Sequence, residues 1–293
     1  EAPVPVVRVL KERTVLGGAA NVAANLQAIG AEPLLVGVLQ NDHAGQRLLA
    51  LLAKLEIGVD GLVFDASRPT IIKTRIIGQQ QQMLRIDREE PGSLSGEVLE
   101  GLEVSLEDVL ERAEALIVSD YAKGVIGKSV MDQVRQICRK RGLPWIVDPK
   151  PSHRELYRGA TLLTPNAKEL AELAGLPSRA DDEVALASRR LQESLDLEGL
   201  LVTRSERGMA LLAPKNGHRD PWMIPTEARE VFDVSGAGDT VIAVFGAAVA
   251  TGADWREAAM LANAAAGIVV GKMGTATTTV EEVLERYHDQ EAL

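Results

Sequence analysis

The sequence predicts an α/β protein with a buried, mostly parallel sheet and a second, smaller sheet that is half polar. From about residue 110 onward, short and uniformly apolar runs alternate with helical patterns. Uniformly apolar strands that alternate with helices indicate a parallel sheet covered on both faces. Two other stretches, 3–15 and 61–88, interleave polar and apolar residues, which is typical of strands with one solvated face. The length of 293 residues suits one large or two small domains, and the two half-polar stretches are expected to be lid strands inserted in the α/β body.

The predicted elements follow one another along the chain. The segment "EPLLVGVLQ" predicts an early buried strand, and "DHAGQRLLALLAKLE" predicts the helix after it. Later strands are predicted at "ALIVSD", "PWIVDP", "TLLTPN" and "LLVTRS", with helices over about 128–140, 166–174 and 181–196. The tail from about 238 to 289 predicts three helices.

The half-polar stretch 61–88 predicts a lid. Strand side chains alternate between faces, so Lys73 and Arg75 fall on one face of their strand, and Met83, Arg85 and Asp87 share a face of theirs. In a lid, such basic residues face a ligand or a partner. A plain solvated sheet face explains the same pattern equally well.

Composition excludes several classes of function. The formal net charge of −10 argues against broad nucleic-acid binding and against an anionic membrane surface. Cys138 is the single cysteine and the four histidines are scattered, so we expect neither an intrachain disulfide nor a His-based metal site. The longest apolar runs are too short to span a bilayer, and no signal peptide opens the chain. A cytoplasmic protein is therefore expected.

The most informative corner between a strand and a helix is "FDVSGAGDTVIAVFGAAVA". Gly236, Ala237 and Gly238 precede a long helix of small residues, and their backbone N–H groups predict an anion cradle at its N-terminus. Asp239 lies in the first turn. A carboxylate beside an anion hole suits phosphoryl transfer, because it can accept the proton of an attacking hydroxyl.

Two further corners carry weaker signals. Asn166 and Glu169 in "LLTPNAKELAEL" can hold a hydrated Mg²⁺ or a phosphate-bound water, although an N-cap with its capping box explains them as well. In "VLGGAANVAANLQAIG", the pair Gly17 and Gly18 opens a helix, and Asn21 can hydrogen-bond a hydroxyl. A tight turn before a helix is the alternative there.

The segment "AKGVIGKS", residues 122–129, fits a loose phosphate-loop pattern between an apolar run and a helix. A P-loop would place Lys128 on a nucleotide phosphate. The segment lies in mid-chain and has Ala122 where such a loop usually has glycine. Its alternative is a loop that ends at Gly127, with Ser129 capping the next helix.

Two segments carry a resemblance that extends over essentially the whole chain. "GGAANVAANLQAIGA" near the start and "DVSGAGDT" near the end resemble the two signatures of the ribokinase-like (phosphofructokinase-B) sugar kinases. Others, among them "RPTIIKTRIIGQQQQMLRIDRE", "SDYAKG" and "ANAAAGIVVGKMGT", are similar to the branch that phosphorylates the 1-hydroxyl of D-glycero-β-D-manno-heptose 7-phosphate for lipopolysaccharide core synthesis. The resemblance implies a single domain over residues 1–293, with a three-layer ribokinase-like fold, a central, mostly parallel sheet and a small β-sheet lid.

The resemblance also implies roles for particular residues. Asp239 becomes the catalytic base, with Gly236, Ala237 and Gly238 as the anion hole. ATP is expected over the C-terminal half, and the implied ATP-binding residues are Asn166, Glu169, Ser205, Glu206, Gly208, Asn263 and Ala266. Mg²⁺ is implied at Glu169 through water, and a monovalent cation is implied near Asp233.

The sugar side is implied by family position and by charge. A substrate that already bears a phosphate needs cations, and arginine offers a bidentate fork to phosphate. The implied substrate-binding residues are Gly17, Gly18, Asn21, Lys73, Arg75, Arg85, Asp120 and Lys123. A homodimer that pairs through the lid is implied as well.

Two departures from the family and three alternatives complete the prediction. The family's first strand, with its Gly-Asp pair, does not appear before "EAPVPVV", and no His-x-Gly-His motif of a fused nucleotidyltransferase is present. We expect a single-function kinase or a kinase domain excised from a longer protein. The alternatives are the same chemistry on another sugar or sugar phosphate, a kinase-like domain without turnover, and a P-loop NTPase switch that uses Lys128.

Overall fold

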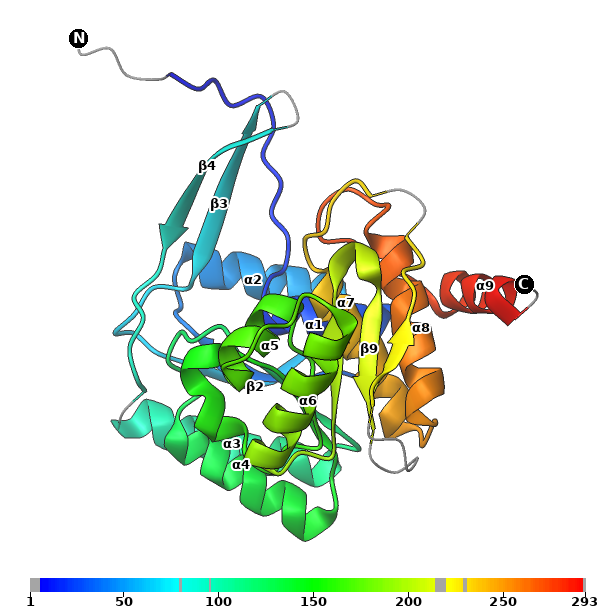
Figure 1. Cartoon of the computed structure of the whole chain (residues 1–293). Coiled ribbons are helices and arrows are strands. Elements are labelled where there is room, and N and C mark those ends of the chain that lie inside the picture. Colours follow the sequence, from blue (N-terminus) through cyan, green and yellow to red (C-terminus); the bar gives the residue numbers. More distant parts are fainter. Residues whose placement is uncertain (1–5, 79–80, 95, 214–219, 229–230, 292–293) are drawn as a thin grey trace.

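The structure, a computed structural model, describes residues 6–78, 81–94, 96–213, 220–228 and 231–291, and its centre is a six-stranded sheet (Figure 1). The strand order is β10-β9-β8-β7-β6-β5; β5 to β8 are parallel, and β9 and β10 are antiparallel to their neighbours. These strands are β5 (Leu116–Ser119), β6 (Trp145–Asp148), β7 (Leu162–Leu163), β8 (Gly199–Thr203), β9 (Met209–Leu212) and β10 (Trp222–Ile224). The buried parallel strands predicted from the apolar runs are confirmed.

Helices cover both faces of this sheet and make the three layers. Neighbouring side chains of one strand point to opposite faces, so Ile146 and Val147 belong to two different cores. One core contains side chains from α3, α4, α5 and α6, and the other contains side chains from α1, α7, α8 and α9. These helices are α1 (Ala19–Ala28), α3 (Gly96–Arg112), α4 (Lys128–Arg141), α5 (Ala167–Ala174), α6 (Asp181–Leu195), α7 (Ala237–Ala250), α8 (Trp255–Val269) and α9 (Val280–Glu291). The sequence analysis predicted all of them except α3.

A two-stranded parallel sheet lies beside the main body. It pairs β1 (Leu34–Leu39) with β2 (Gly58–Phe64), and α2 (His43–Lys54) connects the two strands. The predicted early strand and the helix after it are therefore confirmed. Residues 61–64, expected at the start of the lid, belong instead to β2. This strand packs against α1, α2 and α3 in the body, because Leu62 and Val63 have buried apolar partners there.

The lid is an antiparallel hairpin of β3 (Ile72–Gly78) and β4 (Gln81–Arg88) that projects from the body (Figure 1). The prediction that Lys73 and Arg75 share a face, and that Arg85 and Asp87 share a face, is confirmed. Lys73 lies opposite Asp87 and Arg75 lies opposite Arg85 across the hairpin, so the structure adds that all four side chains are on the same face. The opposite face carries Ile76 opposite Leu84 and Thr74 opposite Ile86.

The predicted strand at 3–15 is wrong for the part that the structure describes. Residues 6–17 adopt no regular secondary structure, while residues 3–5 lie outside the described ranges. Val6, Val9 and Leu10 are 76–89% exposed. Alternating apolar residues satisfy a strand only where a partner strand accepts their backbone hydrogen bonds, and this segment has no such pairing among the described residues.

Candidate active site

The N-terminus of α7 carries the predicted catalytic corner. Gly236 precedes the helix in the left-handed region at φ 82°, and a Cβ there would lie 2.9 Å from the amide nitrogen of Asn21. Glycine is required by both the backbone angle and this close approach. The helix has no side-chain cap at this end, so its first N–H groups remain directed at the site. The Ala237 N–H donates to the carbonyl of Val234 at 3.2 Å, with which an anion would compete.

The carboxylate of Asp239 is buried and held by two donors. The Asn21 side-chain amide donates to Oδ2 at 2.6 Å, and the Tyr121 hydroxyl donates to Oδ1 at 3.2 Å. Burial raises the pKa of Asp239 above its usual range, while these two hydrogen bonds and the charge of Lys150 moderate the rise. A carboxylate with a raised pKa is a stronger base, which suits proton removal from a hydroxyl.

A buried chain of hydrogen bonds fixes Asn21 from behind. Thr240 donates its hydroxyl to Asn25 Oδ1 at 2.8 Å, and the Asn25 amide donates to the backbone carbonyl of Asn21 at 2.8 Å. Asn25 and Thr240 are 1% and 0% exposed. Because this chain joins α1 to α7, it sets the position of Asn21 relative to Asp239. The glycine-rich start of α1 and the glycine corner of α7 are thereby brought together.

Sequence reasoning missed Tyr121. Its ring lies under the start of α1, where a Cβ at Gly18 would be 3.6 Å from ring atom Cε2. The ammonium of Lys150 lies 5.9 Å from the ring centroid, and Gly18 itself has φ 58°. The available signal was the position of Tyr121 directly after the carboxyl end of β5, the edge at which ligands bind in open parallel sheets.

Next to Asp239, an acidic and basic cluster occupies the expected nucleotide side. Lys150 pairs with Glu169 at 2.6 Å. Burial, together with the nearby Glu169 carboxylate, raises the pKa of Asp148 to about 7, although Lys150 acts in the opposite sense. A cation beside Asp148 and Glu169 would relieve this crowding of negative charge.

Asn166 and Glu169 form a complete capping box. Asn166 Oδ1 accepts the N–H of Glu169 at 2.9 Å, and Glu169 Oε2 accepts the N–H of Asn166 at 3.1 Å. The N-cap with its capping box, which the sequence left open as the alternative to a metal or phosphate site, is therefore present in this structure. It does not exclude a metal contact, because the other Glu169 oxygen faces Lys150 beside Asp148. The assignment of Glu169 to Mg²⁺ through water stays a prediction.

Two of the remaining predicted ATP residues, Gly208 and Asn263, lie at the end of β10. Gly208 has φ 75°, and a Cβ there would lie 2.0 Å from the carbonyl oxygen of Ile224. Asn263 is buried and donates its side-chain amide to the carbonyl of Pro225 at 2.7 Å. Ser205 and Glu206 are exposed on the turn between β8 and β9, and Ala266 is half-buried on α8. The structure thus places both Gly208 and Asn263 against the segment of Ile224 and Pro225.

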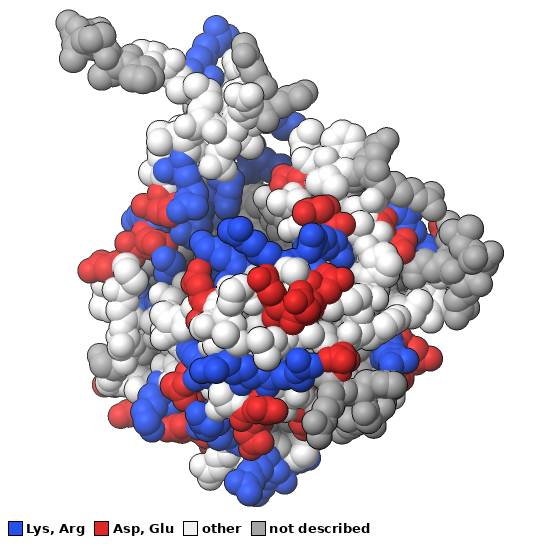
Figure 2. Space-filling view, viewed as in Figure 1, with Lys and Arg blue, Asp and Glu red and all other residues white. Residues whose placement is uncertain are grey.

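Lys and Arg side chains gather around the base of the lid, next to a hollow in this face of the molecule (Figure 2). Lys73 pairs with Asp87 and with Glu89, each at 3.0 Å, and Lys123 pairs with the same Glu89. Glu89 therefore ties the lid to the loop after β5. Arg85 pairs with Asp87 at 3.0 Å. An anionic ligand would have to compete with these carboxylates.

Arg75 and Asp120, which were both predicted to bind the substrate, have different surroundings. Hydrogen bonds from Ser235 lower the pKa of the Asp233 carboxyl, and the nearby charge of Arg75 on the lid adds a smaller effect in the same direction. Asp120 is 0% exposed, and its oxygens bind the Ala122 N–H at 2.7 Å, His153 Nδ1 at 2.7 Å and the Tyr157 hydroxyl at 2.6 Å. A direct contact between Asp120 and a sugar phosphate stays a prediction that this geometry does not favour.

The phosphate-loop pattern at 122–129 serves packing in this structure. A Cβ at Gly124 would lie 1.7 Å from the carbonyl oxygen of Gly92, so this glycine is required by close contact between two loops. The Lys128 side chain is 83% exposed and pairs with Asp132 one turn along α4. The Ser129 hydroxyl donates to Glu103.

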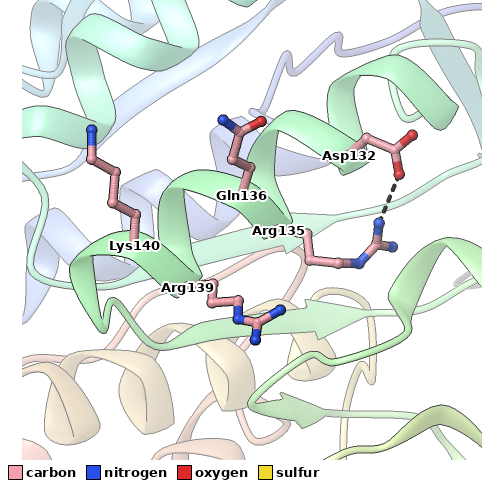
Figure 3. Close-up of a pocket in the computed structure, with 5 residues that line it drawn as sticks. All are labelled: Asp132, Arg135, Gln136, Arg139 and Lys140. Carbon is pink, nitrogen blue, oxygen red and sulfur yellow. Dashed lines mark hydrogen bonds and ion pairs between the residues drawn. The ribbon is translucent and has the colours of Figure 1, made fainter.

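A shallow hollow lies along the outer side of α4 (Figure 3). In this view Arg135 points at Asp132, while the Lys140 side chain points to the other side of the helix. The residues that line this hollow are Asp132, Arg135, Gln136, Arg139 and Lys140. The apolar side of α4 packs in the core opposite to that of α7, so this hollow is separated from Asp239 by the sheet.

A family model described as pfkB family carbohydrate kinase matches residues 2–282. The chain belongs to this family. Membership in the pfkB family confirms the resemblance carried by the two glycine-rich signatures. Within the described residues, no helix is long and apolar enough to cross a membrane.

Relatives within the pfkB family include two kinds of protein. The chain is 44% identical to the D-beta-D-heptose 7-phosphate kinase of Bordetella bronchiseptica, over 97% of this chain and 87% of that protein. It is 43% identical to the bifunctional protein HldE of Desulfatibacillum aliphaticivorans, over 99% of this chain and 59% of that protein. The chain therefore spans about three fifths of the length of the bifunctional relatives that it matches.

Solved structures confirm the pfkB family fold. The Arabidopsis thaliana ribokinase complexed with ribose and ATP superposes with a TM-score of 0.78 at 24% identity, over 96% of this chain and 90% of that chain. A variant of phosphofructokinase-2 from Escherichia coli superposes with a TM-score of 0.82 at 17% identity, over 99% and 93% of the two chains. The predicted three-layer α/β fold with a small lid is confirmed.

Proposed function

We propose that this chain transfers the γ-phosphoryl group of ATP to the 1-hydroxyl of D-glycero-β-D-manno-heptose 7-phosphate. The observation that carries the proposal is the buried Asp239 carboxylate at the uncapped N-terminus of α7, oriented by Asn21 from α1. This arrangement supplies a base and an anion site at one point. The choice of sugar is supported by the names of the relatives that are 43–45% identical to this chain.

In the proposed reaction, Asp239 removes the proton of the sugar hydroxyl as that oxygen attacks the γ-phosphorus. The bond from this phosphorus to the bridging oxygen of ATP breaks, and ADP leaves with the electron pair. The N–H groups at the start of α7 stabilise the charge on the transferring group. Asn21 holds the second carboxylate oxygen, so the base keeps its orientation during the transfer.

The nucleotide phosphates lie, in this proposal, between α7 and the start of α5. Lys150 provides a positive charge there, and Glu169 and Asp148 provide two carboxylates. The described residues include no group of three or more His, Cys, Asp or Glu side chains that could hold a metal ion. Two carboxylates fit Mg²⁺, which in phosphoryl-transfer sites keeps phosphate and water oxygens as its other ligands. When bound, Mg²⁺ neutralises charge on the phosphates.

The lid binds the 7-phosphate in this proposal and excludes water from the site. Its charged face carries Lys73, Arg75 and Arg85. Lys73 and Arg85 are paired with Asp87 before substrate binds, so binding exchanges a carboxylate partner for a phosphate. Closure of the hairpin over the sugar would remove the competing acceptor, water.

We also propose that two copies pair through the lid and that the enzyme works in the cytoplasm. The outward face of the hairpin bears Leu84 and Ile86, which are 54% and 51% exposed. Isolated two-stranded hairpins are marginally stable in water, so a partner that covers this face would stabilise the lid. A cytoplasmic location follows from the use of ATP.

The closest alternative is the same reaction on another sugar or sugar phosphate. The lid cations recognise a phosphate group and do not by themselves select a heptose. A P-loop NTPase has less support, because the Lys128 side chain is exposed and paired with Asp132 of the same helix.

The test is ADP release from Mg²⁺-ATP with a panel of acceptors: heptose 7-phosphate, fructose 6-phosphate, fructose 1-phosphate, ribose and water alone. We expect strong release with heptose 7-phosphate only. Release with another sugar would keep the chemistry and overturn the substrate. Release that is equally fast with water alone would overturn the sugar kinase.

Two substitutions test the assignment of the base. Asp239→Asn should lower kcat by about 10²-fold to 10⁴-fold, the usual contribution of a positioned general base, and leave folding intact. Lys128→Ala is the matched control and should leave the rate near wild type. The reverse pattern would restore the P-loop hypothesis. Circular dichroism and the melting temperature check that each variant is folded.

A further inference from the structure

The two oxygens of the Asp239 carboxylate have different partners. Oδ2 accepts the Asn21 side-chain amide at 2.6 Å, and the hydrogen-bond chain through Asn25 and Thr240 holds the backbone carbonyl of Asn21. Oδ1 accepts the Tyr121 hydroxyl at the longer distance of 3.2 Å. One oxygen is therefore fixed by a short bond from a buried network, and the other is held by a weaker bond from a single side chain.

A sugar hydroxyl that reacts must do what the Tyr121 hydroxyl does here. It must donate its hydrogen to Asp239 before the proton can be transferred. Because Oδ2 is held by Asn21, Oδ1 is the oxygen left for the acceptor. The Tyr121 phenol thus occupies the hydrogen-bonding position that the acceptor requires.

The phenol can hold this position without reacting. Burial, with the neighbouring charges of Asp239 and Asp148, raises the pKa of Tyr121 well above its usual range. It therefore stays protonated and acts as a donor. Its ring is held between the start of α1 at Gly18 and the ammonium of Lys150, so it contacts both the predicted sugar side and the predicted nucleotide side.

Water is the competitor that this arrangement excludes. A water molecule on Oδ1 would be activated as the sugar hydroxyl is, and ATP would then be hydrolysed. We propose that Tyr121 is a positioning residue whose hydroxyl holds Oδ1 of Asp239 while no sugar is bound, keeps water from that oxygen, and yields it to the acceptor hydroxyl. This inference rests on the proposed role of Asp239 as the base.

The experiment compares Tyr121→Phe with wild type in ADP release from Mg²⁺-ATP, with no sugar and with heptose 7-phosphate. Phenylalanine keeps the ring contacts and removes the hydroxyl. The sugar-free rate should rise by about threefold to tenfold, the range expected for loss of one hydrogen bond. Tyr287→Phe on α9 is the matched control and should behave as wild type.

A second readout is the pH dependence with sugar present. The Tyr121 hydrogen bond lowers the pKa of Asp239, so its loss should move the acidic limb of kcat/KM to higher pH. A purely structural role would change the rate without moving this limb. Tyr121→Leu also lacks the hydroxyl and replaces Tyr121→Phe if that variant does not fold.

The outcomes separate the two proposals. A sugar-free rate for Tyr121→Phe that equals or falls below wild type would overturn the role of Tyr121 alone. A wild-type chain that phosphorylates no sugar, or an Asp239→Asn variant that keeps full activity, would overturn the proposed function. A raised sugar-free rate together with a shifted acidic limb would support Tyr121 as inferred.

Discussion

Three aspartates lie at the carboxyl edge of the sheet or beside it, and each has a different environment. Asp120 is fully buried and its oxygens are satisfied by neighbours. Asp239 is buried with two donors, and its pKa is raised chiefly by burial. Asp148 has the same residue type but lies next to Glu169, and burial raises its pKa to about 7. The chemical role of each aspartate is therefore set by its surroundings and not by its residue type.

Asp148 should make folding stability depend on pH. Its folded pKa of about 7 exceeds the ordinary value of 3.8, so between these values the folded protein keeps a proton that the unfolded chain has lost. Stability from this residue is therefore lost as pH rises through that window. Asp148→Asn should raise the unfolding free energy at pH 8 by roughly 2–4 kcal/mol and have little effect near pH 4.

Urea unfolding at pH 4.5, 6 and 8, without nucleotide or Mg²⁺, measures this effect. Asp132→Asn on the surface of α4 is the control. Its pKa is lowered by Lys128 and Arg135, so the substitution should give no gain at pH 8. A gain for Asp148→Asn that is the same at every pH would contradict the assignment.

Asp239 could be predicted from the sequence because glycines and a carboxylate at a helix N-terminus form a local pattern. Tyr121 could not, because its partner Asp239 is 118 residues away and nothing near Tyr121 indicates that contact. The same limit applies to Asn25 and Thr240, which appear from sequence as ordinary helical residues. Contacts between residues that are far apart in the chain determine these roles, and one sequence does not reveal them.

At the scale of the elements, the N-termini of α7, α5 and α4 have similar sequence patterns but differ in whether they can bind an anion. At α7, Gly236 supplies no side chain and the first N–H groups stay directed at the site. At α5, the capping box of Asn166 and Glu169 satisfies the same kind of groups internally. At α4, Gly127 is extended and Lys128 points to solvent. Sequence patterns identified all three helix starts, but only the structure shows which remains open to an anion.

The lid hairpin carries the next prediction. Arg75→Ala and Arg85→Ala should each raise the KM for the sugar phosphate by about tenfold or more and lower kcat less, because each removes a charge-assisted contact to the bound phosphate. Arg88→Ala is the control, since Arg88 lies in the same strand on the opposite face. Steady-state kinetics at varied sugar phosphate measures both constants. An unchanged KM in both variants would remove these residues from the sugar site.

Elements were predicted best where burial on both faces leaves a uniform apolar run, as in β6 and β8. The alternating pattern of β3 and β4 was equally clear. The same alternation misled at residues 6–15, because period-two hydrophobicity does not specify a partner strand. Helix α3 was missed, although its leucines Leu102, Leu106 and Leu110 repeat every four residues and pack in the core.

At the scale of the whole molecule, the lid is the part that the body supports least. It projects from the α/β layers, and every residue of β4 is exposed (Figure 1). One face carries Lys73, Arg75, Arg85 and Asp87, and the opposite face carries mostly apolar side chains, among them Ile76, Leu84 and Ile86. Such an amphipathic hairpin needs a cover on its apolar face, which the proposed second copy supplies.

Leu84→Lys combined with Ile86→Lys should convert a dimer to a monomer. Two charges on the outward face cannot be buried without partners, so the interface should be lost. Sedimentation velocity should give twice the 31.4 kDa chain mass for wild type and the single mass for the variant. Leu186→Lys on α6, at a side chain that is 52% exposed, is the control and should remain dimeric. A wild-type monomer would contradict the proposed pairing.

The hydrogen bond between Asn21 and Asp239 joins residues that are 218 positions apart. Contacts of such separation carry a large loop-closure entropy and form after local structure in most folding reactions. The base therefore acquires its orientation only when the first and last parts of the chain have come together. During synthesis, a partly made chain can possess every strand of the central sheet and still have no assembled site, so catalytic competence marks completion of the fold.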